Sequence, residues 1–167
     1  MVGISVRTRH VRRPLTLIVA VAVLLGFPTP SIAQPAPQIL EGVWAITSIP
    51  RDCTTGAVLG PPVRALLTFH QGGTMTESNA LLLFTPGQRS IDHGAWTHTT
   101  GMTFRQRTVA IILFDGGPFQ AGWTLTTHDI VLSDANNFSS TGTTGFYDLN
   151  RQFLRMVCAS RTGERFR

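Results

Sequence analysis

From Glu41 onward the chain is a succession of short stretches rich in β-branched and aromatic residues, each ended by a turn sequence. Such stretches are typical of β-strands, and glycine-bearing links such as Gln71-Gly72-Gly73 and Asp115-Gly116-Gly117-Pro118 are typical of tight turns. Nowhere do apolar residues keep a 3.6-residue period for three turns, so no amphipathic helix is predicted. The pattern predicts an all-β domain with eight strands, at residues 42–50, 63–70, 74–79, 91–99, 102–114, 119–132, 138–147 and 152–159.

Most links between these strands are short, and consecutive strands pair more often than not. The simplest topology is therefore an antiparallel meander. Eight meandering strands remove their exposed edges by closing into an up-and-down barrel, which is the single-domain fold that we predict. A two-sheet β-sandwich is the alternative that the local pattern leaves open. The one long link is residues 51–62.

The N-terminus has the three parts of a secretion signal. Four arginines lie in the first 13 residues, an apolar run follows at residues 15–27, and Ser31-Ile32-Ala33 offers small residues for cleavage. The run is shorter than the ~20 residues of a spanning helix, so we expect cleavage near Ala33 and no stable membrane span afterwards. The predicted parts are a signal peptide at 1–33, a Pro-rich lead at 34–40 and a barrel domain at 41–167, with the mature protein secreted or periplasmic.

The net charge of +5 comes largely from this removable segment. Four of the fourteen arginines lie there without any acid, which leaves ten arginines against nine acids in the rest of the chain. A nucleic-acid-binding domain needs a basic stripe on its folded surface. The charge distribution therefore predicts no nucleic-acid partner.

Cys53 and Cys158 are the only two cysteines, so one pairing is possible. An oxidising compartment favours a disulfide between them. The bridge would fasten the long link after the first strand to the last strand, and so tie the two ends of the barrel together. Two unrelated buried thiols are the alternative.

Gly42-Val43-Trp44 at the start of the first strand resembles the G-x-W motif that opens the first strand of lipocalins. The eight strands, the long link after the first strand and a cysteine near the C-terminus are also lipocalin-like. The resemblance is to lipocalin-like or calycin-like barrels in the broad sense. Such barrels also occur in small secreted bacterial proteins and in allene oxide cyclase-type enzymes. The resemblance implies a barrel fold. It also implies that an arginine near the end of the last strand packs on Trp44, with Arg155 and Arg161 as candidates.

Side chains alternate between the two faces of a strand, so placing Trp44 inward assigns the apolar set of each strand to the interior. An eight-stranded barrel can hold one small ligand, and the small residues along 139–145 leave volume for it. We predict an exported protein that binds a small hydrophobic molecule in the barrel. The candidate ligand-binding residues are Leu67, Trp96, His98, Phe104, Gln106 and Trp123. A filled barrel whose surface binds another protein is an alternative.

Catalytic and metal-binding motifs are sparse. The histidines after residue 33 have no metal-ligand spacing, and neither a P-loop nor a G-x-S-x-G motif occurs, so no metal, cofactor or catalytic residue is assigned. The enzyme alternative is a barrel of isomerase or cyclase type, with His98 as general acid or base and Gln106 orienting an apolar substrate. Val109–Phe114 is apolar on both faces, which predicts that a loop or a second copy of the chain covers it.

Overall fold

The computed structural model describes residues 40–80, 84–85, 87–117 and 119–167. In chain order the strands are β1 (Gly42–Arg51), β2 (Val63–Phe69), β3 (Thr74–Asn79), β4 (Asp92–Thr100), β5 (Thr103–Ile112), β6 (Gly122–Leu132), β7 (Asn137–Asp148) and β8 (Phe153–Arg165). No helix in these residues is long and apolar enough to cross a membrane. The predicted signal peptide, residues 34–39 of the predicted lead and residues 81–83 lie outside the described residues.

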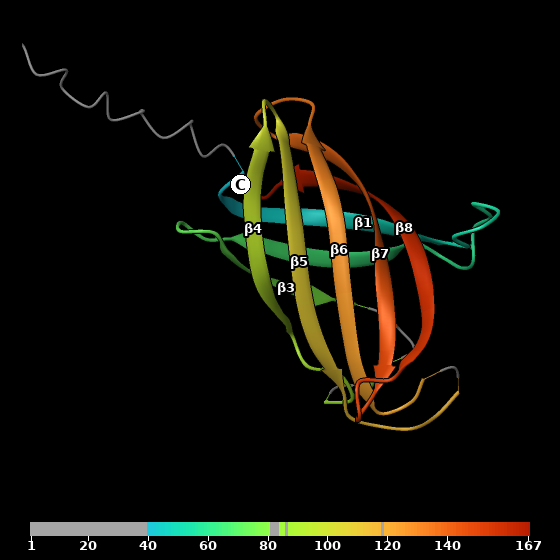
Figure 1. The fold of residues 1–167 in the computed structure, drawn as a ribbon. Coiled ribbons are helices and arrows are strands. Elements are labelled where there is room, and N and C mark those ends of the chain that lie inside the picture. The colour runs from blue at the N-terminus through green and yellow to red at the C-terminus, as the bar shows by residue number, and fades with distance from the viewer. Residues whose placement is uncertain (1–39, 81–83, 86, 118) are drawn as a thin grey trace, which may run out of the picture. The chain divides into compact units, whose positions relative to one another are not determined.

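The strands follow one another around a closed antiparallel barrel (Figure 1). Each strand pairs with its sequence neighbours, and β1 also pairs with β8 over eight residues, from Trp44↔Arg165 to Arg51↔Cys158. The predicted up-and-down barrel is therefore confirmed. The two-sheet sandwich is wrong, because a sandwich would leave β1 and β8 as edges of separate sheets.

The last strand continues past the predicted end at residue 159 as far as Arg165. Gly163 lies opposite Phe138 on β7, and a Cβ at this glycine would overlap the Phe138 ring. A glycine inside a strand often marks a place where another group approaches closely. Here Gly163 makes room for the Phe138 ring.

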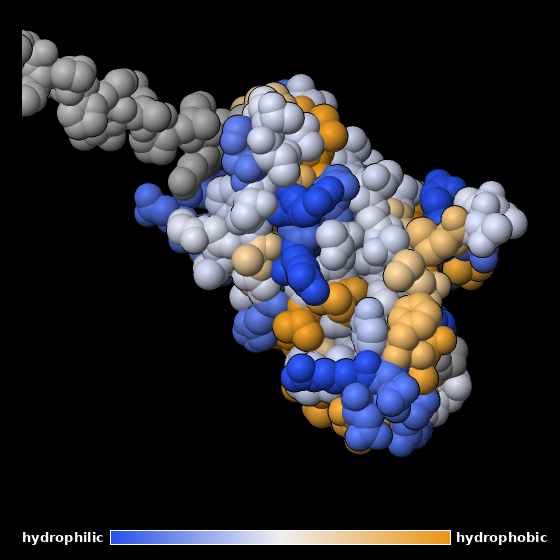
Figure 2. All heavy atoms as spheres, viewed as in Figure 1, coloured by the Kyte–Doolittle hydropathy of each residue, from blue (hydrophilic) through white to orange (hydrophobic). Residues whose placement is uncertain are grey.

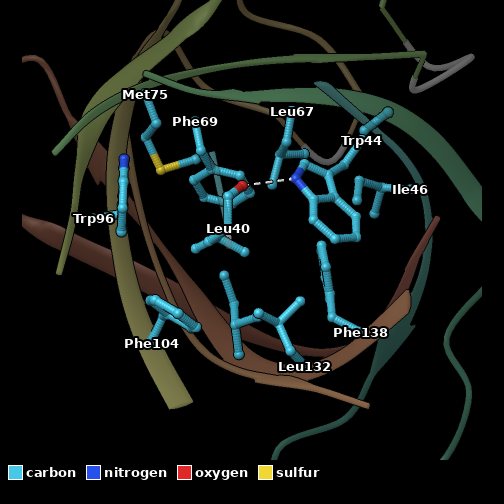
Figure 3. Packing of buried hydrophobic residues seen from close by; sticks show 12 residues of the cluster. Leu40, Trp44, Ile46, Leu67, Phe69, Met75, Trp96, Phe104, Leu132 and Phe138 are labelled. Carbon is cyan, nitrogen blue, oxygen red and sulfur yellow. Dashed lines mark hydrogen bonds between the residues drawn. The ribbon is translucent and has the colours of Figure 1, made fainter. Parts of the chain in front are cut away.

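The interior at one end of the barrel is filled by an apolar end cluster (Figure 3). Its members are Leu40, Trp44, Ile46, Ala65, Leu67, Phe69, Met75, Trp96, Phe104, Ile130, Leu132 and Phe138. Leu40 and Trp44 are fully buried, and the Trp44 indole Nε1 donates a hydrogen bond to the Leu40 carbonyl oxygen at 2.8 Å. That bond fixes the chain just before β1 inside the barrel, so this end is closed.

Arg165 is the arginine that packs on Trp44, with its guanidinium carbon 4.3 Å from the ring centroid. The candidates Arg155 and Arg161 were both wrong. The reason is the greater length of β8, which places Arg165 directly opposite Trp44. Arg155 instead lies 4.0 Å from the ring centroid of Phe146, and Arg161 points into the interior.

The predicted disulfide between Cys53 and Cys158 is confirmed, with the two Cα atoms 5.0 Å apart. It joins the link after β1 to β8, two residues beyond Arg51, the last paired residue of β1. A disulfide of this kind indicates an oxidising environment.

We expect the variant Cys53→Ser/Cys158→Ser to lose about 2–4 kcal/mol of unfolding free energy, because the bridge restricts a long loop of the unfolded chain. The bridged residues are 105 apart in sequence. Urea denaturation followed by circular dichroism measures the loss. Reduction of the wild type should reproduce it and should not affect the variant. Equal stability of the variant and the oxidised wild type would contradict this role.

Candidate functional site: a polar belt inside the barrel

Next to the apolar end cluster the interior becomes polar. Two strands show the change at successive inward-facing residues: Phe104 is followed by Gln106 on β5, and Met75 by Glu77 on β3. We call the buried polar residues the polar belt; they are Glu77, Asp92, Gln106, Thr108, Thr124, Thr126, His128, Ser140 and Arg161. Buried polar groups cost free energy unless they are hydrogen-bonded, so a belt of nine in one barrel requires an explanation.

One ion pair crosses the barrel interior. The Arg161 guanidinium donates from NH1 to the Glu77 carboxylate at 3.0 Å, although β8 and β3 are not neighbours in the sheet. Both side chains are more than nine-tenths buried. A buried ion pair gains little net stability, but removing one partner leaves an uncompensated charge in a medium of low polarity.

A second ion pair lies beside the first. Arg89 donates two hydrogen bonds to the Asp92 carboxylate, at 2.7 and 2.8 Å, and its NH2 also lies 3.5 Å from the Thr124 hydroxyl. Burial raises the pKa of Asp92, against the opposing effect of Arg89. The nearby Glu77 carboxylate raises the Asp92 pKa further. The two pairs together place two carboxylates and two guanidiniums in or next to the belt.

His128 is a buried, neutral histidine in the belt. Burial lowers its pKa to about 2, with a further contribution from the positive charge of Arg161. Its Nδ1 lies 3.3 Å from the Ser140 hydroxyl. Gly142 on β7 pairs with His128, and a Cβ there would overlap the imidazole. Part of the volume that we expected the small residues of β7 to leave empty is therefore filled by this ring.

Four belt side chains each keep one buried polar atom without a hydrogen-bond partner in the described part of the chain: Gln106 Nε2, Thr108 Oγ1, His128 Nε2 and Arg161 Nε. Gln106 is paired directly with His128 across β5 and β6, and Thr108 is the next inward residue after Gln106. Each such atom costs about 1–3 kcal/mol when it is left unsatisfied. These four atoms are hydrogen-bonding capacity that the described part of the fold leaves unused.

Beyond the belt, the opposite end of the barrel carries an aromatic end cluster, made of Phe84, Phe114, Phe119 and Phe146. The ring centroids of Phe84 and Phe119 are 4.4 Å apart. Arg155 lies over Phe119 and Phe146. Strand β5 leads from one end to the other, because Phe104, Gln106, Thr108 and Ala110 succeed one another on its inner face before the link that contains Phe114.

The structure divides the sequence-predicted site residues among different places. Leu67, Trp96 and Phe104 lie in the apolar end cluster, and Gln106 lies in the belt. His98 is exposed near the end of β4, where its Nε2 lies 2.8 Å from the Gly101 carbonyl oxygen and its ring contacts Phe104. His98 and Gln106 are therefore not brought together in one catalytic site.

Trp123 was assigned to the wrong face. On β6 the inner face carries Thr124, Thr126 and His128, while Trp123 lies outside with Arg151 5.7 Å from its ring centroid. The prediction takes the apolar face of each strand as the inner one, whereas the inner face of β6 at Thr124, Thr126 and His128 is polar. A one-residue shift in this choice exchanges the two faces of a strand.

The sequence reasoning missed the charged members of the belt. Glu77 and Arg161 could have been found by alternation, since Glu77 follows Met75 by two residues and Arg161 precedes Gly163 by two. No local signal shows that these two residues, 84 positions apart, are partners. The described residues hold no group of three His, Cys, Asp or Glu side chains that could bind a metal ion.

Val109–Phe114 is not covered on both faces within the described residues. Ala110 and Ile112 are buried inside the barrel, whereas Val109 and Leu113 are exposed, so no described loop covers the outer face. The face drawn in Figure 2 mixes hydrophilic and hydrophobic side chains over the strands. A homo-oligomer through this segment stays a prediction.

Comparison with known proteins found no match to this chain among protein-family models, curated proteins or solved structures.

The neutral state of His128 predicts a specific pH dependence. Between pH 6.5 and about 2 the unfolded chain binds a proton at this residue and the folded chain does not, so stability falls as the pH is lowered through this range. One proton changes the unfolding free energy by about 1.4 kcal/mol per pH unit. His128→Gln should therefore be about 2 kcal/mol less sensitive than the wild type between pH 7.5 and 5.

Urea denaturation of both proteins at the two pH values measures this difference. Asp92 titrates in both, so its contribution cancels. Gln152→Leu, which changes an exposed side chain that does not titrate, is the control and should keep the wild-type slope. Identical slopes for His128→Gln and the wild type would show that His128 takes up a proton in the folded barrel.

The ion pair across the barrel predicts strong coupling between its partners. Arg161→Met should cost about 3–5 kcal/mol of unfolding free energy, because Glu77 then remains buried without its cation. Adding Glu77→Met should restore at least half of the loss. A double-mutant cycle by chemical denaturation measures the coupling. Additive losses would mean that the two side chains do not depend on each other.

Proposed function

We propose that this protein is an exported binding protein for a small, mainly apolar molecule, held inside the barrel with its polar group against the polar belt. The observation that carries the proposal is the set of four buried polar side chains with unpartnered atoms, Gln106, Thr108, His128 and Arg161. A bound molecule that hydrogen-bonds to these atoms would remove the free-energy cost of leaving them unsatisfied in the barrel.

The arrangement of the interior supports the same proposal. Ligand sites in proteins are mostly apolar, with a few polar groups that fix orientation. Here the belt lies between the apolar end cluster and the aromatic end cluster, and an eight-stranded barrel has the diameter for one small ligand. The lipocalin-like Gly42-Val43-Trp44 start and the closed barrel fit a carrier of this kind.

The aromatic end is the proposed route into the barrel. The other end is closed by Leu40 and Trp44, which are fully buried and joined by a hydrogen bond. At the aromatic end, Phe84 and Arg155 are only half-buried and belong to or border the links between strands. Half-buried side chains lose less packing than fully buried ones when they move aside, so entry at this end costs less than entry through the apolar end cluster.

Export is supported by the predicted signal peptide at residues 1–33 and by the Cys53–Cys158 disulfide. The enzyme alternative of isomerase or cyclase type gains no support, because it requires His98 beside Gln106. The exposed position of His98 separates it from the belt.

We expect Gln106→Leu to weaken ligand binding at least tenfold. The same substitution should lower the unfolding free energy by less than about 0.5 kcal/mol, or else raise it. The reason is that Gln106 Nε2 makes no hydrogen bond to described residues, so the fold loses no such bond when it is removed. The test uses protein recovered after export of the full chain. Fluorescence titration with 6-propionyl-2-dimethylaminonaphthalene, a neutral apolar probe that carries one carbonyl group, measures binding, and urea denaturation measures stability.

The matched control is Gln152→Leu, which changes an exposed glutamine between β7 and β8 and should leave both quantities as in the wild type. If Gln106→Leu destabilises the protein without changing binding, Gln106 is a core residue. If the wild type binds no probe and native mass spectrometry shows no added mass, the barrel is filled and the binding function is wrong.

A further inference from the structure

We propose that the polar group received by the belt is a neutral carbonyl oxygen, as in a ketone, aldehyde or ester, and that the belt rejects carboxylates and amines. This inference rests on the proposed function and specifies the ligand class of the same site. Three observations carry it: the balance of fixed charges, the engagement of each charged group, and the donor character of the unpartnered atoms.

The fixed charges of the belt already cancel. Arg161 is paired with Glu77, and Arg89, at the border of the belt, is paired with Asp92. His128, the remaining titratable group in the belt, has its Nδ1 at the Ser140 hydroxyl and is surrounded by buried residues. A ligand carboxylate would therefore add a net negative charge to a buried site that already holds two carboxylates. An unpaired charge in such a site costs several kcal/mol.

The two guanidiniums that serve the belt are engaged by these pairs. Arg89 is committed to Asp92 through both NH1 and NH2, and Arg161 donates from NH1 to Glu77. A ligand anion could form an end-on bidentate pair with Arg89 only by displacing Asp92, and at Arg161 it would have to share one guanidinium with Glu77. Either arrangement buries three carboxylates against two guanidiniums, and the uncompensated charge disfavours the ligand anion.

The unpartnered atoms favour a ligand group that accepts hydrogen bonds. Gln106 Nε2 and Arg161 Nε can only donate, while Thr108 Oγ1 and His128 Nε2 can take either role. A carbonyl oxygen has two lone pairs and carries no charge, so it can receive two of these donors without adding charge to the belt. An ammonium group has donors only, and it would face Gln106 and Arg161 donor to donor.

His128 connects the two obligate donors. Gln106 lies directly opposite it across β5 and β6, and Arg161 is close enough for its positive charge to lower the His128 pKa. His128 contacts Ser140 on β7, which is paired with Arg161 on β8, so His128 lies between the two donors. We place the ligand carbonyl at this wall of the interior.

The test compares 2-decanone, decanoate and decylamine, which share an apolar tail and differ in the polar group. Displacement of 6-propionyl-2-dimethylaminonaphthalene from the exported protein at pH 7.5 gives the three affinities. We expect 2-decanone to bind at least tenfold more tightly than either charged compound. We further expect Gln106→Leu to reduce 2-decanone binding at least tenfold, and Gln152→Leu to leave it unchanged.

The outcomes separate this inference from the proposed function. If decanoate binds as tightly as 2-decanone, the inference is overturned while ligand binding stands. Loss of that decanoate binding in Arg155→Gln would then place the carboxylate at the aromatic end instead of the belt. If the wild type prefers 2-decanone to the charged compounds but Gln106→Leu binds 2-decanone as tightly as the wild type does, the belt does not hydrogen-bond the carbonyl and the inference fails. If neither the fluorescent probe nor any of the three compounds binds, both proposals fail.

Discussion

The pairing of β1 with β8 is the constraint on which the rest of the molecule depends. It joins the first and last strands by a ladder from Trp44↔Arg165 to Arg51↔Cys158, and it turns a curved sheet into a closed wall. Every backbone group of the eight strands can then find its partner within the wall. The disulfide adds a covalent connection at one end of this ladder, and Arg165 on Trp44 adds a cation–π contact at the other.

Closure also determines the energetics of the interior. Side chains that point inward are withdrawn from water, so each polar one must be satisfied by a neighbour or by a bound molecule. The apolar end cluster meets this condition by packing alone, apart from a few groups such as the Trp44 indole, which donates to Leu40. The belt meets it only in part. The charged groups are satisfied by the two ion pairs. One polar atom each of Gln106, Thr108, His128 and Arg161 has no hydrogen-bond partner among the described residues.

The pattern of strands and turns was sufficient for the architecture, and on most strands it was sufficient for the inner face. On β5 the inward assignment of Phe104 and Gln106 is confirmed. On β6 the same reasoning chose Trp123 and was wrong, because the rule that apolar residues lie inside fails where the interior is polar. The candidate site was therefore found in part: Gln106 was identified, while Glu77, His128 and Arg161 were not.

The sequence by itself determined what depends on nearest neighbours along the chain. It contained the eight strands, the turns between them and the single possible cysteine pair. Only the tertiary structure decided which face of β6 is buried, that Arg165 and not Arg155 or Arg161 packs on Trp44, and that Arg161 meets Glu77. The physical reason is that a strand has two equivalent faces, and the choice between them rests on contacts with strands distant in the chain. A buried charge likewise has its partner chosen by the closed barrel, across its interior, and not by spacing along the sequence.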